Sequence, residues 1–175
     1  MNEISSRLGT MLTLNAVALR ESLHSCLAVD RWVDEVAAGA PYIEASELVE
    51  AARSAATRLS RAEVDEALAE HPRIGQAAAQ ISTPAAAEFS RREQASVDAD
   101  DAELAVLLAT GNRAYEARFG RVFLIRAAGR TRAEILAELN RRLALPDEVE
   151  AAIVAEQLRE IALLRLAALL DRSAI

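Results

Sequence analysis

Two histidines are the only side chains in this sequence that ordinarily carry protons near neutral pH, because the unperturbed pKa of histidine is about 6.5. His71 stands among helix-breaking residues, in Glu70-His71-Pro72-Arg73-Ile74-Gly75. It is a candidate proton carrier. The alternative is a histidine that ends a helix, where the helix dipole favours its positive charge. His24 is expected on an ordinary helix surface.

A second polar group lies in Phe89-Ser90-Arg91-Arg92-Glu93-Gln94. Ser90, Glu93 and Gln94 place a hydroxyl, a carboxylate and an amide within about one helical turn. Such groups could bind a polar substrate. The spacing of Ser90 and Glu93 is also that of a capping box, so a helix start alone explains these two.

Arg165 is the basic residue with the most informative setting, a mainly apolar face of the last expected helix. The other residues of that face, at spacings of three and four, are Val154, Leu158, Ile161 and Ala168. Such an arginine either extends its charged end to the edge of the apolar face or points at an anion. If the face is buried, an unpaired guanidinium is costly, so we then expect a carboxylate partner from the protein or from a ligand. An internal ion pair with Glu93 or Glu70 and a contact with a bound anion both meet this expectation.

The segment Phe119–Arg130 is too apolar for an ordinary connecting loop. Buried irregular backbone must find hydrogen-bond partners. These partners could come from a ligand rich in N–H and C=O groups. The commoner case is an extended piece of chain that crosses the core.

Helices are expected to position these residues. Hydrophobic residues make up 52% of the chain and aromatic ones only 3%, and the abundance of alanine favours helix over sheet. Apolar periodicity and helix-start signals predict helices that begin near Leu8, Trp32, Ser46, Ser60, Thr83, Asp98, Thr131 and Pro146. Val122–Ile125 is the only strand-like run, and one strand has no partner. We therefore predict a single all-α domain over residues 1–175.

Local signals define several helix ends. Ser60 with Glu63 and Thr131 with Glu134 have capping-box spacing. Gly120 is expected to close the long helix before it in the left-handed conformation. The apolar stripe of that helix is expected to comprise Leu104, Leu107, Leu108, Gly111, Tyr115 and Phe119.

The composition excludes several chemistries. All 20 basic residues are arginine, so no lysine can form a Schiff base, anchor pyridoxal phosphate or serve a Walker-type phosphate site. A net charge of −7 argues against a nucleic-acid partner. One cysteine, Cys26, and two histidines argue against a metal site. We see no membrane-spanning run and no signal-peptide pattern, so we expect a cytoplasmic protein without a membrane partner.

The motifs together resemble one known family, the 2-oxo-4-hydroxy-4-carboxy-5-ureidoimidazoline (OHCU) decarboxylases of urate breakdown. The resemblance covers nearly the whole chain. Its most specific segments, in chain order, are His71–Gly75, Phe89–Gln94, Tyr115–Gly120 leading into Phe123–Ile125, and Glu160–Leu166.

The resemblance implies an all-helical fold and decarboxylation of a small anionic ureidoimidazoline to (S)-allantoin and CO2, with no cofactor and no metal. It makes His71 the proton donor and matches Glu93 and Arg165 to catalytic positions, with Arg126 or Arg159 as alternatives to Arg165. It also implies a homodimer. The matching substrate-binding residues are Pro72, Ser90, Gln94, Phe123, Leu124, Ile125, Arg126 and Ala127.

Alternatives to this activity remain open. His71 could act as a base toward the ring hydroxyl instead of as an acid. A non-catalytic helical ligand-binding or adaptor module would show an exposed apolar groove, and His71, Glu93 and Arg165 would not converge. A ligand-sensing regulator would keep the pocket without turnover.

Overall fold

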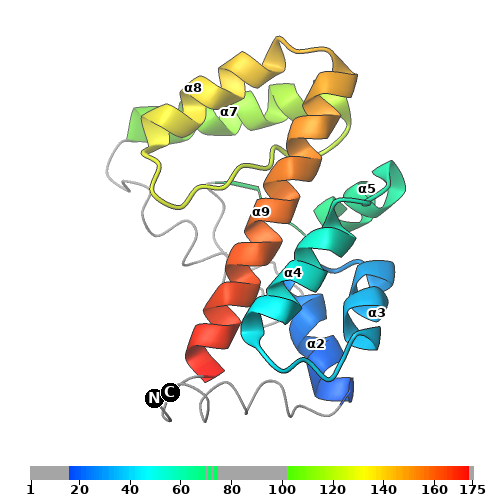
Figure 1. Ribbon diagram of the computed structural model, residues 1–175. Coiled ribbons are helices and arrows are strands. Elements are labelled where there is room, and N and C mark those ends of the chain that lie inside the picture. Colours follow the sequence, from blue (N-terminus) through cyan, green and yellow to red (C-terminus); the bar gives the residue numbers. More distant parts are fainter. Residues whose placement is uncertain (1–15, 70, 72, 75–101, 174–175) are drawn as a thin grey trace. The chain divides into compact units, whose positions relative to one another are not determined.

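The regular structure of the chain is helical (Figure 1). The computed structural model describes residues 16–69, 71, 73–74 and 102–173, and every regular element among them is a helix. The predicted all-α class is confirmed. The helices are α2 (Ala16–Cys26), α3 (Asp30–Ala38), α4 (Ala45–Ala56), α5 (Arg61–Ala69), α7 (Ala102–Phe119), α8 (Arg132–Leu143) and α9 (Asp147–Ser173).

Contacts divide the chain into two compact units. The first comprises the residues up to Glu63 and those from Arg159 onward, and the second runs from Val64 to Leu158. Helices α5 and α9 each contribute residues to both units. The prediction of one domain over residues 1–175 stays a prediction.

In the first unit, α3 packs against α2 and α4. Its three apolar residues Trp32, Val33 and Val36 are buried, as their spacing indicates. Trp32 is fully buried, and its indole N–H donates a hydrogen bond of 2.9 Å to the Ala52 carbonyl on α4. A buried indole N–H needs such an acceptor, so this bond fixes how α3 and α4 meet.

The start of α5 confirms the predicted capping box. The Glu63 backbone N–H donates to Ser60 Oγ at 3.3 Å, and the Ser60 N–H donates to the Glu63 carboxylate at 2.7 Å. Arg31 of α3 also pairs with this carboxylate. The Arg31 hydrogen bond, helped by the Ser60 bonds, lowers the pKa of Glu63 from 4.5 to about 2.

In the second unit, α7 and α8 approach closely where α7 carries Gly111. A Cβ atom at this position would lie 2.5 Å from Leu139 Cδ2 on α8, so glycine allows the close approach. The predicted signals hold at both neighbouring helix ends. Gly120 ends α7 with φ +68°, and the Thr131 and Glu134 side chains form the capping box of α8.

The prediction that Leu107 belongs to the apolar stripe of α7 is wrong. Leu107 is 45% exposed, whereas the buried residues of this helix are Leu108, Asn112 and Tyr115. Leu107 is rotated by about 100° from Leu108 around the helix axis. The buried face is therefore narrower than the apolar pattern, and it includes a polar residue.

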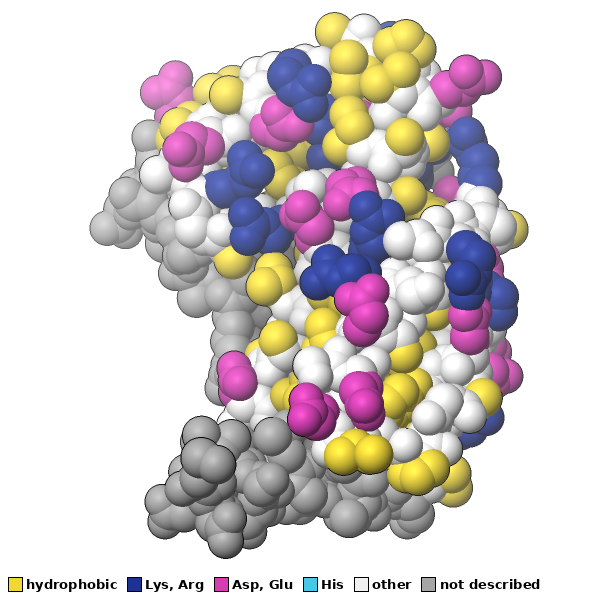
Figure 2. Space-filling view, viewed as in Figure 1, with side chains coloured by type: hydrophobic (Ala, Val, Ile, Leu, Met, Phe, Trp, Pro, Cys, Tyr) yellow, Lys and Arg dark blue, Asp and Glu magenta, His cyan; other side chains and the backbone are white. Residues whose placement is uncertain are grey.

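Acidic and basic side chains lie next to one another on the face shown in Figure 2 rather than in separate patches. Glu138 and Arg141, three residues apart on α8, form a surface ion pair. Within the described part of the chain, no helix is long and apolar enough to cross a membrane.

Candidate active site

His71 lies two positions after the last residue of α5 and is hydrogen-bonded to the last turn of that helix. Its backbone N–H donates to the Leu68 carbonyl at 3.0 Å, and its ring Nδ1 lies 2.9 Å from the Ala67 carbonyl oxygen. Because a carbonyl oxygen only accepts hydrogen bonds, Nδ1 must carry a hydrogen. In this geometry Nε2 is the ring nitrogen that gains or releases a proton. The contact with Ala67 therefore orients the ring of His71 at the end of α5.

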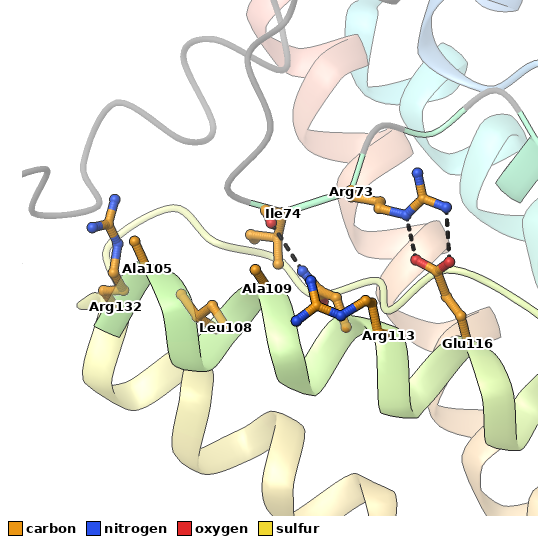
Figure 3. Close-up of a pocket in the computed structure, with 9 residues that line it drawn as sticks. Arg73, Ile74, Ala105, Leu108, Ala109, Arg113, Glu116 and Arg132 are labelled. Atoms are coloured by element: carbon orange, nitrogen blue, oxygen red, sulfur yellow. Dashed lines mark hydrogen bonds and ion pairs between the residues drawn. The ribbon is translucent and has the colours of Figure 1, made fainter. Parts of the chain in front are cut away.

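The residues that follow His71 are anchored on α7. Asn112, which is 5% exposed, donates from Nδ2 to the Ile74 carbonyl at 3.1 Å. The guanidinium of Arg73 points to the carboxylate of Glu116 and bonds both of its oxygens (Figure 3). The Arg73 hydrogen bond lowers the pKa of Glu116. These two contacts fix the chain shortly after His71.

The segment Phe123–Ala127 contains neither helix nor strand, and four of its five residues are buried. Three of them belong to the same hydrophobic cluster as Ile74. Two regions that the sequence predicts to bind substrate are therefore joined through one core. The buried members of this cluster are Ile74, Leu108, Tyr115, Phe123, Ile125, Ala127, Ile135 and Leu139.

A buried polar network supports this segment from α7, α8 and α9. Arg142 donates from Nη1 to the Leu124 carbonyl at 2.8 Å and from Nε to both oxygens of Glu150 at 2.9 and 3.1 Å. Tyr115 donates its hydroxyl to Glu150. Burial, reinforced by the Glu150 bond, raises the pKa of Tyr115. The Arg142 guanidinium also lies over the Phe123 ring, 4.7 Å from its centre.

The side chains that hold the two segments were not predicted from the sequence. The spacing of Asn112, four residues after Leu108 and three before Tyr115, does indicate that it lies on the buried face of α7. No sequence pattern indicates the role of Arg142, because a cation near a helix end is normally explained by the helix dipole. No pattern indicates the role of Gln157 either, although its Oε1 accepts a hydrogen bond of 2.8 Å from the Arg126 N–H.

Arg165 is 5% exposed, and Val154, Leu158 and Ile161 of the same helix face are also buried. Arg165 belongs to the first unit, whereas His71 and Phe123–Ala127 belong to the second. A shared pocket for His71 and Arg165 stays a prediction. The remaining predicted site residues, Pro72, Ser90, Glu93 and Gln94, lie outside the described residues.

A cavity of about 360 Å³ lies in the second unit beside α7, with Arg73, Asn112 and Glu116 among its lining residues (Figure 3). Of the predicted site residues that the structure describes, none lines it. Among the described lining residues, Arg73 and Ile74 are neighbours in the chain of the predicted site residue Pro72.

The residues 16–69, 71, 73–74 and 102–173 contain no group of three or more His, Cys, Asp or Glu side chains that could hold a metal ion.

Known proteins with similar sequence or structure point to one family. A family model described as OHCU decarboxylase matches residues 13–167. The solved structure of an OHCU decarboxylase in the presence of (S)-allantoin is 28% identical, with a TM-score of 0.70, over 85% of this chain and 96% of that chain. An (S)-allantoin synthase is similar in fold, at 18% identity and a TM-score of 0.66, over 92% of this chain and 53% of that chain. A search of curated protein sequences gave no match. Because the family model spans most of the chain, this protein belongs to the OHCU decarboxylase family of carboxy-lyases.

Proposed function

We propose that this protein converts OHCU to (S)-allantoin and CO2 in urate breakdown, without a cofactor. The bond between the ring carbon and the carboxylate breaks, CO2 leaves, and the electron pair passes into the adjacent C=N group. A proton added to the carbon of that group creates the stereocentre, and the ring nitrogen that received the electron pair takes up a second proton. The ring hydroxyl loses its proton to become a carbonyl, so the net uptake is one proton for each carboxylate lost. The substrate thus supplies its own electron sink, and the protein must orient it and deliver a proton to one face.

His71 is the proton donor in this proposal. Its Nδ1 hydrogen is engaged with the Ala67 carbonyl at the end of α5, so the charged ring donates from Nε2. The same geometry allows neutral Nε2 to accept the hydroxyl proton, which is the alternative role. This tautomer-fixing contact, in a chain of the OHCU decarboxylase family, is the observation that carries the proposal.

The remaining roles follow from the charge and polarity of the substrate. Arg165 binds an anionic oxygen, since guanidinium groups bind carboxylates strongly. Glu93 and Gln94 hold ureido N–H and C=O groups, Ser90 adds a hydroxyl contact and Pro72 a further contact. Backbone groups of residues 123–127 complete the site. The similar structure at 28% identity was solved with (S)-allantoin, the product proposed here.

The test is the chirality of the product, because OHCU also decays without enzyme. We expect the wild-type protein to form (S)-allantoin, followed by circular dichroism, and His71→Asn to lose stereospecific formation by at least about 100-fold, the usual range for a general acid. The control is His24→Asn, which changes the only other histidine, on α2. Wild-type rate and chirality in His71→Asn would refute the role of His71. No activity in the wild type would favour a binding module.

The oligomeric state and location are proposed with the activity. We propose a homodimer in the cytoplasm. Light scattering coupled to size-exclusion chromatography should give about twice the chain mass of 18.9 kDa; a monomer at micromolar concentration would contradict the dimer.

A further inference from the structure

The backbone of Phe123–Ala127 is held by two side chains from distant parts of the sequence. The Leu124 carbonyl accepts a 2.8 Å hydrogen bond from Arg142 of α8. The Arg126 N–H donates a 2.8 Å hydrogen bond to Gln157 of α9. Both bonds lie within the second unit.

These two bonds flank Ile125 and set the direction of its backbone groups. In a trans peptide the C=O and N–H point in opposite directions within one plane. The Arg126 N–H shares its peptide with the Ile125 C=O, so the bond to Gln157 directs that C=O away from Gln157. The Leu124 C=O shares its peptide with the Ile125 N–H, which is likewise directed away from Arg142.

Gln157 is the anchor whose role can be separated from folding. Arg142 is fully buried with Glu150, so its removal would leave the Glu150 charge without a partner and destabilise the folded protein. Gln157 is only partly buried on α9 and contributes a neutral amide.

We propose that Gln157 is a positioning residue: by holding the Arg126 N–H it presets the Ile125 carbonyl for the ureido N–H groups of the substrate. This inference rests on the function proposed above. Fixed dipoles bind a ligand without spending free energy on reorientation. Gln157 itself need not touch the substrate, because it acts through the peptide.

The experiment compares Gln157→Met, which keeps the length of the side chain but removes the acceptor, with Gln157→Glu, which keeps an acceptor oxygen. We expect KM for OHCU to rise about tenfold in Gln157→Met, as for one lost hydrogen bond, and kcat to stay within about twofold, as for binding lost equally from ground and transition states. Gln157→Glu should restore KM to within about threefold of the wild-type value. Val149→Met is the control, an exposed site on the same helix.

Hydrogen exchange of the Arg126 amide, measured without substrate, is the second readout. The exchange rate should increase at least about tenfold in Gln157→Met, because the hydrogen bond that protects the amide is lost. Exchange should remain slow in Gln157→Glu. Unchanged exchange in Gln157→Met would overturn the anchor whether or not the protein is an OHCU decarboxylase. Accelerated exchange with wild-type KM in an active enzyme would overturn the positioning role. An inactive wild type with accelerated exchange would refute the proposed function and, with it, the substrate role, while leaving the anchor established.

Discussion

Arg142 and Glu150 form an ion pair in which both side chains are completely shielded from solvent. Arg142 is contributed by α8 and Glu150 by the first turn of α9. The pair is further bonded to the Tyr115 hydroxyl and the Leu124 carbonyl, so each charge has several partners. Removing one partner would leave the other charge buried without compensation.

We predict that Glu150→Gln lowers the free energy of unfolding by about 3–5 kcal/mol, because the Arg142 charge stays buried after its carboxylate is lost. Urea unfolding at pH 7 measures the change. The control is Arg141→Ala, which removes the adjacent arginine and its exposed pair with Glu138. That surface pair should contribute less than about 1 kcal/mol.

A double variant separates two contributions to the free energy of unfolding, the penalty for one unpaired buried charge and the net stabilisation by the ion pair. Arg142→Met with Glu150→Leu replaces both charges by apolar groups, so neither is left uncompensated. It should be more stable than Glu150→Gln alone. If the double variant is the less stable of the two, the attraction between Arg142 and Glu150 exceeds the free energy of desolvating both charges. An uncompensated Arg142 charge would then not explain the loss of stability in Glu150→Gln.

Much of the helical framework could be predicted, because its signals are local. The capping box at Thr131 and the glycine at position 120 act over a few residues and hold in the structure. The bonding partners of the anchoring side chains could not be predicted in this way. Asn112 binds Ile74 across 38 positions and Gln157 binds Arg126 across 31. Only the folded chain distinguishes buried Arg142 from exposed Arg141.

Trp32 gives a test of the first unit. Trp32→Phe removes the hydrogen bond to Ala52 and leaves unfilled volume at a fully buried position. We expect a loss of about 2–4 kcal/mol in unfolding free energy from the cavity and the lost bond together. Val17→Ala, at an exposed position of α2, should change it by less than about 0.5 kcal/mol. Equal effects of the two substitutions would contradict the central position of Trp32.

Glu63 should make stability depend on acid pH. Its pKa is lowered from 4.5 to about 2 by the Arg31 hydrogen bond and those of Ser60, so the ionised form is favoured in the folded state. Its stabilisation is complete above pH 4.5 and is lost as the pH falls from 4.5 toward 2. Glu63→Gln should therefore be less stable than wild type at pH 7 by urea unfolding, with the difference shrinking toward pH 2.

The matched control for Glu63 is Glu66→Gln, on the exposed side of the same helix. It should leave the pH dependence of unfolding close to that of the wild type. A Glu63→Gln profile parallel to the wild-type profile between pH 7 and 2.5 would show that the Arg31 pair does not carry this dependence.

Asn112 provides the test of the anchor behind His71. Asn112→Ala leaves the Ile74 carbonyl without its side-chain donor, which should cost about 1–3 kcal/mol. Asn112→Asp keeps the shape but, when ionised, places an acceptor against that carbonyl in a buried site, so it should be the more damaging variant at pH 7. Below about pH 4 the protonated acid regains a donor, and the gap between the two variants should narrow in urea unfolding. Arg113→Ala, one residue along on the exposed face of α7, should be near neutral. A gap between Asp and Ala that is constant with pH would mean that the side chain at position 112 fills space and does not donate to Ile74.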